Sequence, residues 1–287
     1  MKAGNSGGPR VPNAHEEGQA APPLLEVSGL SFSYPRGKSV FSDVSFFLRA
    51  GEIFVLIGPN GSGKTTLLNC VAGLLKPECG EIRLSGKDAA SINPRDRARM
   101  LCYLSQLDKT SAEYTAIDYV VMGRAPYLRF GESPGAADYA RAERILASLG
   151  IARRANTQLN HLSGGERQQA RVGRILMQDA RIVLLDEPTN HLDYGNQLCT
   201  LNKIASLANE GYAVLMTSHA PDHALLLDGC VSVLGAEGGG LLIGDAESIL
   251  TEKLLCDLYG VRILVTKTRD LTRTVILPDE LIDKKKN

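Results

Sequence analysis

A glycine-rich segment, residues 58–66, has the residue types and the spacing that bind phosphate. It matches the pattern G-x-x-x-x-G-K-[ST], in which glycines let backbone N–H groups surround phosphate oxygens and the next helix points its positive end at them. The lysine of this pattern reaches the β- and γ-phosphates of a nucleotide, and the hydroxyl after it ligates Mg²⁺. We therefore expect this phosphate-binding loop to bind nucleotide through Gly58, Pro59, Asn60, Gly61, Ser62, Gly63, Lys64, Thr65 and Thr66.

Two consecutive acids, Asp186 and Glu187, follow the apolar run Ile182–Leu185. In nucleotide-hydrolysing proteins with such a loop, a neighbouring strand ends in an aspartate that holds Mg²⁺. Asp186 suits that role beside Thr65, and Glu187 is placed to act as general base on the attacking water. Taken alone, the pair is equally typical of two solvated acids at a strand end, but the phosphate-binding loop favours the functional interpretation.

The segment Leu162–Gln169, with the sequence LSGGERQQ, precedes these acids. Ser163 and Glu166 have the S-x-x-E spacing of a capping box, which predicts that a helix begins at Ser163. The two glycines, Gly164 and Gly165, leave backbone N–H groups open to an anion at that helix start. The spacing by itself is typical of an ordinary capped helix, so an anion-binding role depends on the rest of the chain.

LSGGERQQ resembles the signature motif of ATP-binding cassette (ABC) ATPases, and the resemblance extends over roughly residues 24–260. It implies binding of ATP and Mg²⁺, with the signature segment (residues 162–169) contacting nucleotide through its serine and two glycines. It also implies roles for four further residues: adenine stacking by Tyr34, catalytic and metal contact by Gln106, nucleotide contact in a D-loop by Asp193, and catalytic γ-phosphate contact by His219.

Four short apolar runs are continuous rather than alternating, which is typical of strands buried on both faces. They favour an α/β fold with a parallel sheet covered by helices, and a helix is predicted over Lys64–Leu75 after the loop. The resemblance specifies this fold further as a P-loop NTPase domain of the ABC-ATPase type. It implies a mostly parallel sheet, an N-terminal antiparallel β subdomain and an inserted α-helical subdomain. The four runs are Ile53–Ile57, Met100–Leu104, Ile182–Leu185 and Ala213–Met216.

The helical insertion is expected at about residues 107–165, inside an ABC ATPase domain that covers residues 24–260. Thr115 and Asp118 have the spacing of a variant helix start. A later helix presents Tyr139, Ala142, Ile145, Leu146 and Leu149 on one face, and Gly150 is expected to end it.

The two ends of the chain have a different character. Residues 1–23 contain four glycines and four prolines and are predicted to form a disordered tail. Residues 261–287 are predicted to form a short C-terminal extension with two β-like stretches, Ile263–Val265 and Thr274–Leu277.

Composition argues against several classes of function. Lys and Arg total 32 and Asp and Glu total 32, so the chain has no net charge with which to bind nucleic acid by bulk electrostatics. No apolar run approaches the roughly twenty residues of a membrane-spanning helix. The six cysteines include no CxxC pair and are typical of buried side chains in a reducing cytosol, and the five histidines lack metal-ligand spacing.

The resemblance further implies a head-to-tail dimer, in which each ATP lies between the loop of one copy and Ser163 and Gly165 of the other. Residues 119–128 and 193–197 resemble ATPases of iron–siderophore, haem and cobalamin importers. We therefore expect an ATP-hydrolysing subunit, peripheral on the cytoplasmic face of the membrane, with an integral membrane permease and indirectly a substrate-binding protein as partners. The alternative is a soluble ABC ATPase that drives macromolecular assembly or repair without a permease.

Overall fold

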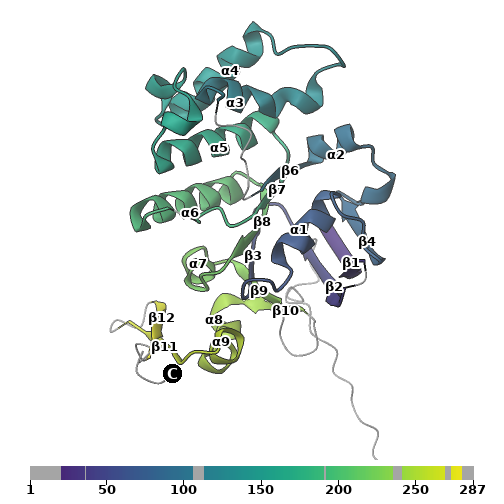
Figure 1. Cartoon of the computed structure of the whole chain (residues 1–287), viewed down its shortest axis with the longest axis vertical. Helices are drawn as coiled ribbons and strands as arrows, with labels where there is room; N and C mark the ends of the chain where they lie inside the picture. The colour runs from purple at the N-terminus through teal and green to yellow at the C-terminus, as the bar shows by residue number, and fades with distance from the viewer. Residues whose placement is uncertain are drawn as a thin grey trace, which may run out of the picture.

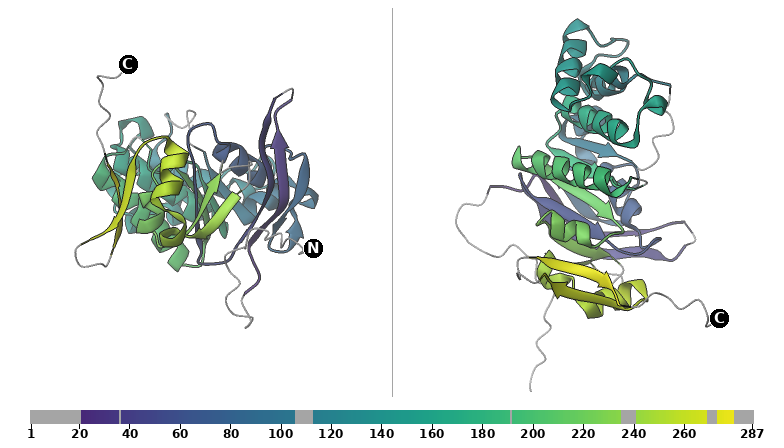
Figure 2. Two further views of the ribbon diagram at one scale, coloured as in Figure 1. Left: turned by 90° about the horizontal axis from the view of Figure 1, so that it is seen from below. Right: turned by 90° about the vertical axis from the view of Figure 1, so that its left-hand side faces the viewer.

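Two sheets with helices packed against them position the phosphate-binding loop (Figure 1). A group of helices lies at one end of this body and a two-stranded sheet lies at the other (Figure 2). Gln106 and residues 1–20 of the predicted tail lie outside the described residues, as do residues 280–287. The computed structural model describes residues 21–35, 37–105, 113–190, 192–234, 241–268 and 273–279.

The central sheet, within the described residues, is six-stranded in the order β10-β9-β3-β8-β7-β6. Its neighbouring strands pair in parallel from β9 to β6, and β10 pairs antiparallel with β9. Every residue of β3, β7 and β8 is buried, which confirms the predicted parallel sheet. The carboxyl ends of these strands therefore bring the loop after β3 and the acids after β7 to one edge. The bounds are β3 (Ile53–Ile57), β6 (Leu101–Leu104), β7 (Ile182–Leu185), β8 (Ala213–Ser218), β9 (Cys230–Leu234) and β10 (Leu241–Asp245).

A second sheet of four strands within the described residues, in the order β2-β1-β4-β5, is antiparallel throughout. Its apolar residues pack against α1 and one face of the central sheet; the rings of Phe46 and Phe54 stack across this contact with centroids 4.9 Å apart. The sheet confirms the expected N-terminal antiparallel β subdomain, and Tyr34 follows its strand β1. The bounds are β1 (Leu25–Ser33), β2 (Ser39–Leu48), β4 (Cys79–Leu84) and β5 (Lys87–Asp88).

Two predicted boundaries are wrong by a few residues. Helix α1 (Lys64–Ala72) ends before Leu75, because Gly73 adopts a left-handed conformation and its N–H bonds to the carbonyl of Cys70. Strand β6 begins at Leu101, because Met100 is the last residue of α2 (Pro94–Met100). The remaining elements around the sheets are η1 (Ala89–Ser91), α6 (Tyr194–Asn209), α7 (Asp222–Leu226), α8 (Ala246–Ile249) and α9 (Glu252–Tyr259).

The helices at the end of the body have a core of their own, which joins α3, α4 and α5. Thr115 caps α3 by accepting a hydrogen bond from the Asp118 N–H, as predicted. Ala142 and Leu146 are fully buried in this core, and Gly150 follows α4 with a φ of 77°. The bounds are α3 (Ala116–Val121), η3 (Met122–Tyr127), α4 (Ala136–Ser148), η4 (Ala152–Arg154), η5 (Leu159–His161) and α5 (Gly164–Gln178).

The C-terminal stretches pair as an antiparallel hairpin of β11 (Ile263–Lys267) and β12 (Thr274–Pro278). Ile263, Val265 and Ile276 pack it against the cluster of buried side chains on the α6 side of the central sheet. Among the described residues, no helix combines the length and the apolar character that crossing a membrane requires.

Candidate nucleotide-binding site

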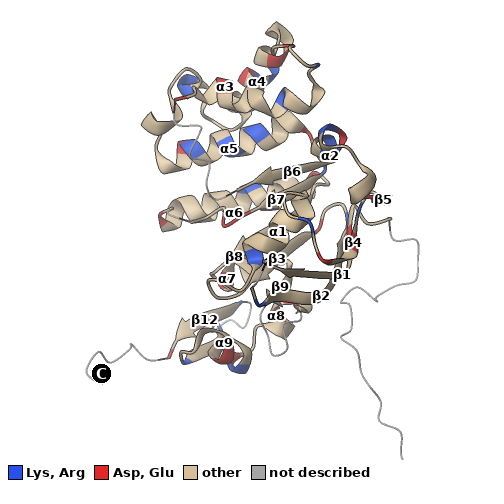
Figure 3. Cartoon of the chain, turned by 45° about the vertical axis from the view of Figure 1, so that its right-hand side comes forward, with Lys and Arg blue, Asp and Glu red and all other residues tan. Residues whose placement is uncertain are grey.

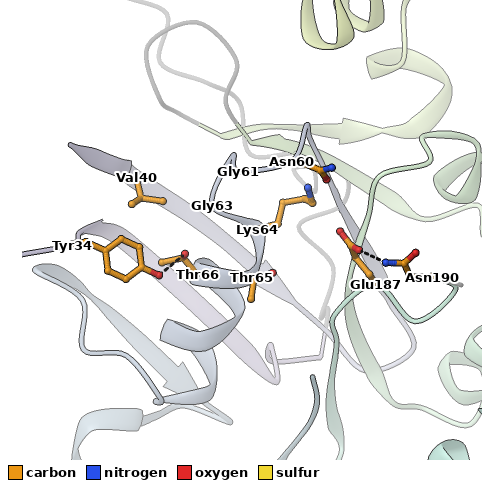
Figure 4. Close-up of a pocket in the computed structure, with 10 residues that line it drawn as sticks. All are labelled: Tyr34, Val40, Asn60, Gly61, Gly63, Lys64, Thr65, Thr66, Glu187 and Asn190. Atoms are coloured by element: carbon orange, nitrogen blue, oxygen red, sulfur yellow. Dashed lines mark hydrogen bonds between the residues drawn. The ribbon is translucent and has the colours of Figure 1, made fainter. Parts of the chain in front are cut away.

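A cleft of about 680 Å³ lies over the phosphate-binding loop. The structure brings four separate parts of the chain together in it: the segment after β1, the start of β2, the loop itself and the residues after β7 (Figure 4). Its volume lies within the range of small-molecule sites, about 300–1,000 Å³. The lining residues are Tyr34, Val40, Asn60, Gly61, Gly63, Lys64, Thr65, Thr66, Glu187 and Asn190.

Two glycines of the loop, Gly58 and Gly63, leave no room for a side chain. Gly63 immediately precedes α1 with a φ of 98°, and a Cβ there would lie 2.5 Å from Cγ1 of Val40. A Cβ at Gly58 would lie 2.8 Å from the carbonyl oxygen of Leu234. Because α1 has no side-chain cap at Gly63, its first N–H groups are left for another partner.

Lys64 is buried beneath this loop, with 5% of its surface exposed. Its Nζ donates hydrogen bonds to the carbonyl oxygens of Gly58 (2.8 Å) and Pro59 (3.0 Å). Burial lowers the pKa of Lys64, while the nearby charges of Glu187 and Asp186 act to raise it. The ammonium group therefore lies at the loop. There, the negatively charged oxygens of a phosphate can replace the two uncharged carbonyl oxygens as its hydrogen-bond acceptors.

Ser62 provides a further sign that an anion fits the loop. Its Oγ is buried and has no hydrogen-bond partner within the described residues. Buried hydroxyl groups are nearly always paired, so an unpaired one at a phosphate-binding loop fits a ligand oxygen.

Asp186 joins the loop to the neighbouring strands. Its carboxyl is almost fully buried, and Oδ1 accepts hydrogen bonds from Thr65 Oγ1 (3.2 Å) and Thr217 Oγ1 (2.7 Å). A hydroxyl and a carboxylate are the oxygen ligands that Mg²⁺ prefers, and it usually keeps several waters besides one or two protein ligands. The pair Thr65 and Asp186 fits such a cation, although the described residues contain no group of three or more His, Cys, Asp or Glu that could hold a metal ion.

Glu187 lines the cleft on the side opposite Tyr34 (Figure 4). Its backbone is left-handed, with a φ of 47°, and its N–H donates to Thr217 Oγ1 at 2.8 Å. The carboxylate oxygen Oε2 accepts a hydrogen bond from Asn190 Nδ2 at 3.0 Å. A non-glycine residue held in this conformation costs about 1–3 kcal/mol and is typical of functional sites.

Sequence reasoning missed Thr217, Asn190 and Val40. Thr217 holds both Asp186 and the N–H of Glu187, and its signal was a polar residue near the end of the otherwise apolar strand β8. Asn190 lies three residues after Glu187, a spacing at which its amide reaches the carboxylate. Val40 gives no sequence signal, because only the fold brings β2 against Gly63.

Tyr34 lies at the edge of the cleft with 48% of its surface exposed. Its hydroxyl hydrogen-bonds with Thr66 Oγ1 at 3.2 Å, and its ring meets Phe32 edge-on with centroids 5.0 Å apart. These contacts fix the ring beside the start of α1 and leave aromatic surface available for stacking.

The signature segment lies apart from the cleft. Ser163 forms the predicted capping box: its Oγ accepts from the Glu166 N–H (3.3 Å), and the Glu166 carboxylate accepts from the Ser163 N–H (3.0 Å). Ser163 and Gly164 are exposed at the start of α5. At Gly165, a Cβ would meet Asn196 Oδ1 of α6 at 2.3 Å, so this glycine permits close helix packing.

Two other expected site residues are also outside the cleft lining. Asp193 is exposed and caps α6 through the N–H of Asn196, and this hydrogen bond is the main cause of its lowered pKa. His219 is exposed directly after β8.

Helix α5 carries a line of arginines (Figure 3), one of which reaches the end of β6. Arg171 donates through Nη2 to the carbonyl oxygen of Ser105 at 2.7 Å. This hydrogen bond attaches the helix that begins at the signature segment to the end of β6.

The family model described as "ABC transporter" matches residues 41–190. The hemin import ATP-binding protein HmuV of Myxococcus xanthus is 32% identical over 262 residues, which cover 89% of this chain and 97% of the relative. The cobalamin import ATP-binding protein BtuD of Halobacterium salinarum is 35% identical over 244 residues, 84% of this chain and 60% of the relative.

One solved structure, an inward-facing transporter assigned to the metal-chelate type, superposes with a TM-score of 0.77 at 26% identity, covering 90% of this chain and 98% of that one. The geometry of the loop, the buried aspartate and the cleft agrees with these similarities. The chain belongs to the family of ATP-binding cassette (ABC) ATPases.

Proposed function

We propose that this chain is the ATP-hydrolysing subunit of an uptake system for an iron–siderophore, haem or cobalamin-type substrate. A separate membrane permease carries the substrate, and the chain supplies the energy. The observation that carries the hydrolytic part is the cleft, where a phosphate-binding loop, a buried aspartate and a glutamate of the cleft wall converge. The import part is supported by the hemin and cobalamin relatives and by the metal-chelate neighbour.

ATP binding uses the groups that line the cleft. The N–H groups of residues 58–66 and the positive end of α1 surround the phosphates. Lys64 exchanges its bonds to Gly58 and Pro59 for phosphate oxygens, and Ser62 donates its unpaired hydroxyl. The Tyr34 ring stacks on the adenine, a contact worth about 1–3 kcal/mol in nucleic-acid sites.

Thr65 and Asp186, together with Gln106, would hold Mg²⁺, which would neutralise charge on the phosphate oxygens. Glu187 accepts a proton from the attacking water at its carboxylate. Asn190 donates to one carboxylate oxygen of Glu187 and so helps to hold this side chain in the wall of the cleft. His219 contacts the γ-phosphate from the loop after β8.

The exposed signature segment completes the site of a second copy of this chain. Ser163, Gly164 and Gly165, with Asp193 of the neighbouring loop, face the nucleotide held by the other copy. The Ser163 hydroxyl accepts a hydrogen bond within its own helix but still has a proton to donate to a phosphate. Because ATP then contacts both copies, it stabilises the closed dimer. Hydrolysis removes the γ-phosphate contact and lets the dimer open.

Transport requires contact with an integral membrane permease. The segment from α3 to η3, which resembles the importer ATPases in sequence, is the part of the chain that we assign to this contact. The protein then acts at the cytoplasmic face of the membrane, and a substrate-binding protein takes part indirectly through the permease. No nucleic acid takes part in this cycle.

Affinity purification from gently solubilised membranes, with mass spectrometry of the co-purifying proteins, tests the import role. We expect a permease with several membrane spans in stoichiometric amount, and its own binding protein would identify the substrate. Recovery in the soluble fraction with cytosolic partners would contradict import and support an assembly or repair ATPase, with the ATP chemistry unchanged.

A further inference from the structure

The C-terminal part of the chain reaches the loop that carries His219. Tyr259, the last residue of α9, donates a hydrogen bond from its hydroxyl to the backbone carbonyl oxygen of His219 at 3.2 Å. The two residues are 40 positions apart in the sequence. Strand β12 of the C-terminal hairpin contacts α7, the helix that follows the His219 loop (Figure 1).

Hydrogen bonds around Ser218 fix the loop on both sides of His219. The Ser218 hydroxyl is buried, accepts from the Ala220 N–H at 3.0 Å and lies 2.9 Å from Nδ1 of His223. Burial lowers the pKa of His223. The Tyr259 hydroxyl adds a contact at the His219 peptide itself.

Helix α9, which ends at Tyr259, is attached to the C-terminal hairpin. The Val265 N–H donates to Glu252 Oε1 at 3.0 Å, and the Ile263 N–H donates to Cys256 Sγ at 3.3 Å. The neighbouring Leu255 is fully buried. Burial also raises the pKa of Tyr259 to about 12, so its hydroxyl keeps its proton and remains a donor at neutral pH.

We propose that Tyr259 is a positioning residue for His219: its hydroxyl holds the His219 carbonyl and thereby orients the imidazole towards the γ-phosphate. The C-terminal hairpin then contributes to hydrolysis as the support for α9. The proposal rests on the γ-phosphate contact of His219 in the proposed function, and variants at the two positions separate the two claims.

Tyr259→Phe removes only the hydroxyl and keeps the packed ring. We expect kcat for ATP hydrolysis to fall roughly 3- to 10-fold, as for loss of one hydrogen bond that orients a catalytic group. The KM for ATP should stay within about twofold, because no residue of the phosphate-binding loop changes. Tyr212→Phe is the matched control: its hydroxyl contacts Asp179 Oδ1 at 3.4 Å, before the start of β8, and kcat should not change.

The decisive comparison is made in a His219→Ala background, with residual hydrolysis measured by single turnover. If Tyr259 acts through His219, Tyr259→Phe causes no further loss there, because the imidazole that it orients is absent. An equal loss in both backgrounds, or a full kcat in Tyr259→Phe alone, would overturn the positioning role and leave the proposed function intact. Full activity of His219→Ala would overturn the role of His219 and the inference with it.

Discussion

The phosphate-binding loop and the signature segment both place glycines at the start of a helix, but their surroundings differ. At the loop, Lys64 and Asp186 are buried and bonded to their own chain, and a cleft lies over them. At the signature segment, Ser163 and Gly164 are exposed, and neither residue lines the cleft. In the proposed function, the cleft of one copy holds the nucleotide and the exposed signature segment of the other copy completes the site.

The two helix starts differ in the same way. Helix α1 has no side-chain cap, so its N–H groups remain for a ligand, whereas α5 is closed by the Ser163–Glu166 capping box. A helix start whose N–H groups bond to its own side chains needs no ligand to satisfy them. The loop should therefore govern ATP affinity, and the signature segment should govern dimer closure and hydrolysis.

Glu187→Gln should have the largest effect on hydrolysis. Loss of a general base lowers the rate roughly 10²- to 10⁴-fold, while ATP binding is retained because the loop is unchanged. Phosphate release and nucleotide binding are measured on the same preparation. Asp228→Asn is the control, because Asp228 is another acid with a φ of 47° and does not line the cleft. A Glu187→Gln rate near that of the unaltered protein would place the base elsewhere.

Lys64→Ala should remove ATP binding, with an affinity loss of about 100-fold or more, since charge-assisted bonds to phosphate disappear. Titration with a fluorescent ATP analogue measures this. Lys87→Ala, at an exposed lysine of β5, should bind normally. Unchanged affinity in Lys64→Ala would mean that residues 58–66 do not hold the phosphates.

Ser163→Ala should slow hydrolysis without changing ATP affinity, and so distinguish the role of the signature segment from that of the loop. We expect unchanged ATP affinity and a roughly 10- to 100-fold slower hydrolysis, because the serine contacts the nucleotide of the other copy through a charge-assisted bond. The substitution also removes a helix cap worth about 1 kcal/mol. Asn93→Ala, which removes the cap of α2, controls for that loss and should leave hydrolysis unchanged. Equal rates in the two variants would make Ser163 a cap alone.

Tyr34→Ala should lower ATP affinity less than Lys64→Ala does. Loss of adenine stacking lowers ATP affinity roughly 5- to 100-fold and affects GTP less if the ring discriminates between bases. Tyr34→Phe keeps the ring and loses only the contact with Thr66, so its affinity should stay close to that of the unaltered protein. Similar affinities for Tyr34→Ala and Tyr34→Phe would show that the ring does not stack.

Much of the loop region could be predicted from the sequence, because its chemistry is local. The glycine spacing, the lysine, the apolar strand before the loop and the helix after it specify one arrangement, which the structure shows. The capping box at Ser163 is local as well and is confirmed. The predicted end of α1 is wrong, since the left-handed Gly73 ends the helix three residues before Leu75.

Contacts between distant segments could not be predicted. Thr217 holds both acids only because β8 lies beside β7 in the sheet, and no spacing along the chain encodes that order. The contact of Tyr259 with His219 depends in the same way on the packing of α9. The roles of Gln106 and of the signature glycines remain predictions of the family resemblance.

We propose that ATP is enclosed between two copies of this chain. The most direct measurement is the molar mass of Glu187→Gln by light scattering, with ATP and Mg²⁺ and again without nucleotide. We expect a stable dimer with ATP and a monomer without it, because slowed hydrolysis preserves the γ-phosphate contact to both copies. A protein that binds ATP and remains monomeric would contradict the claim.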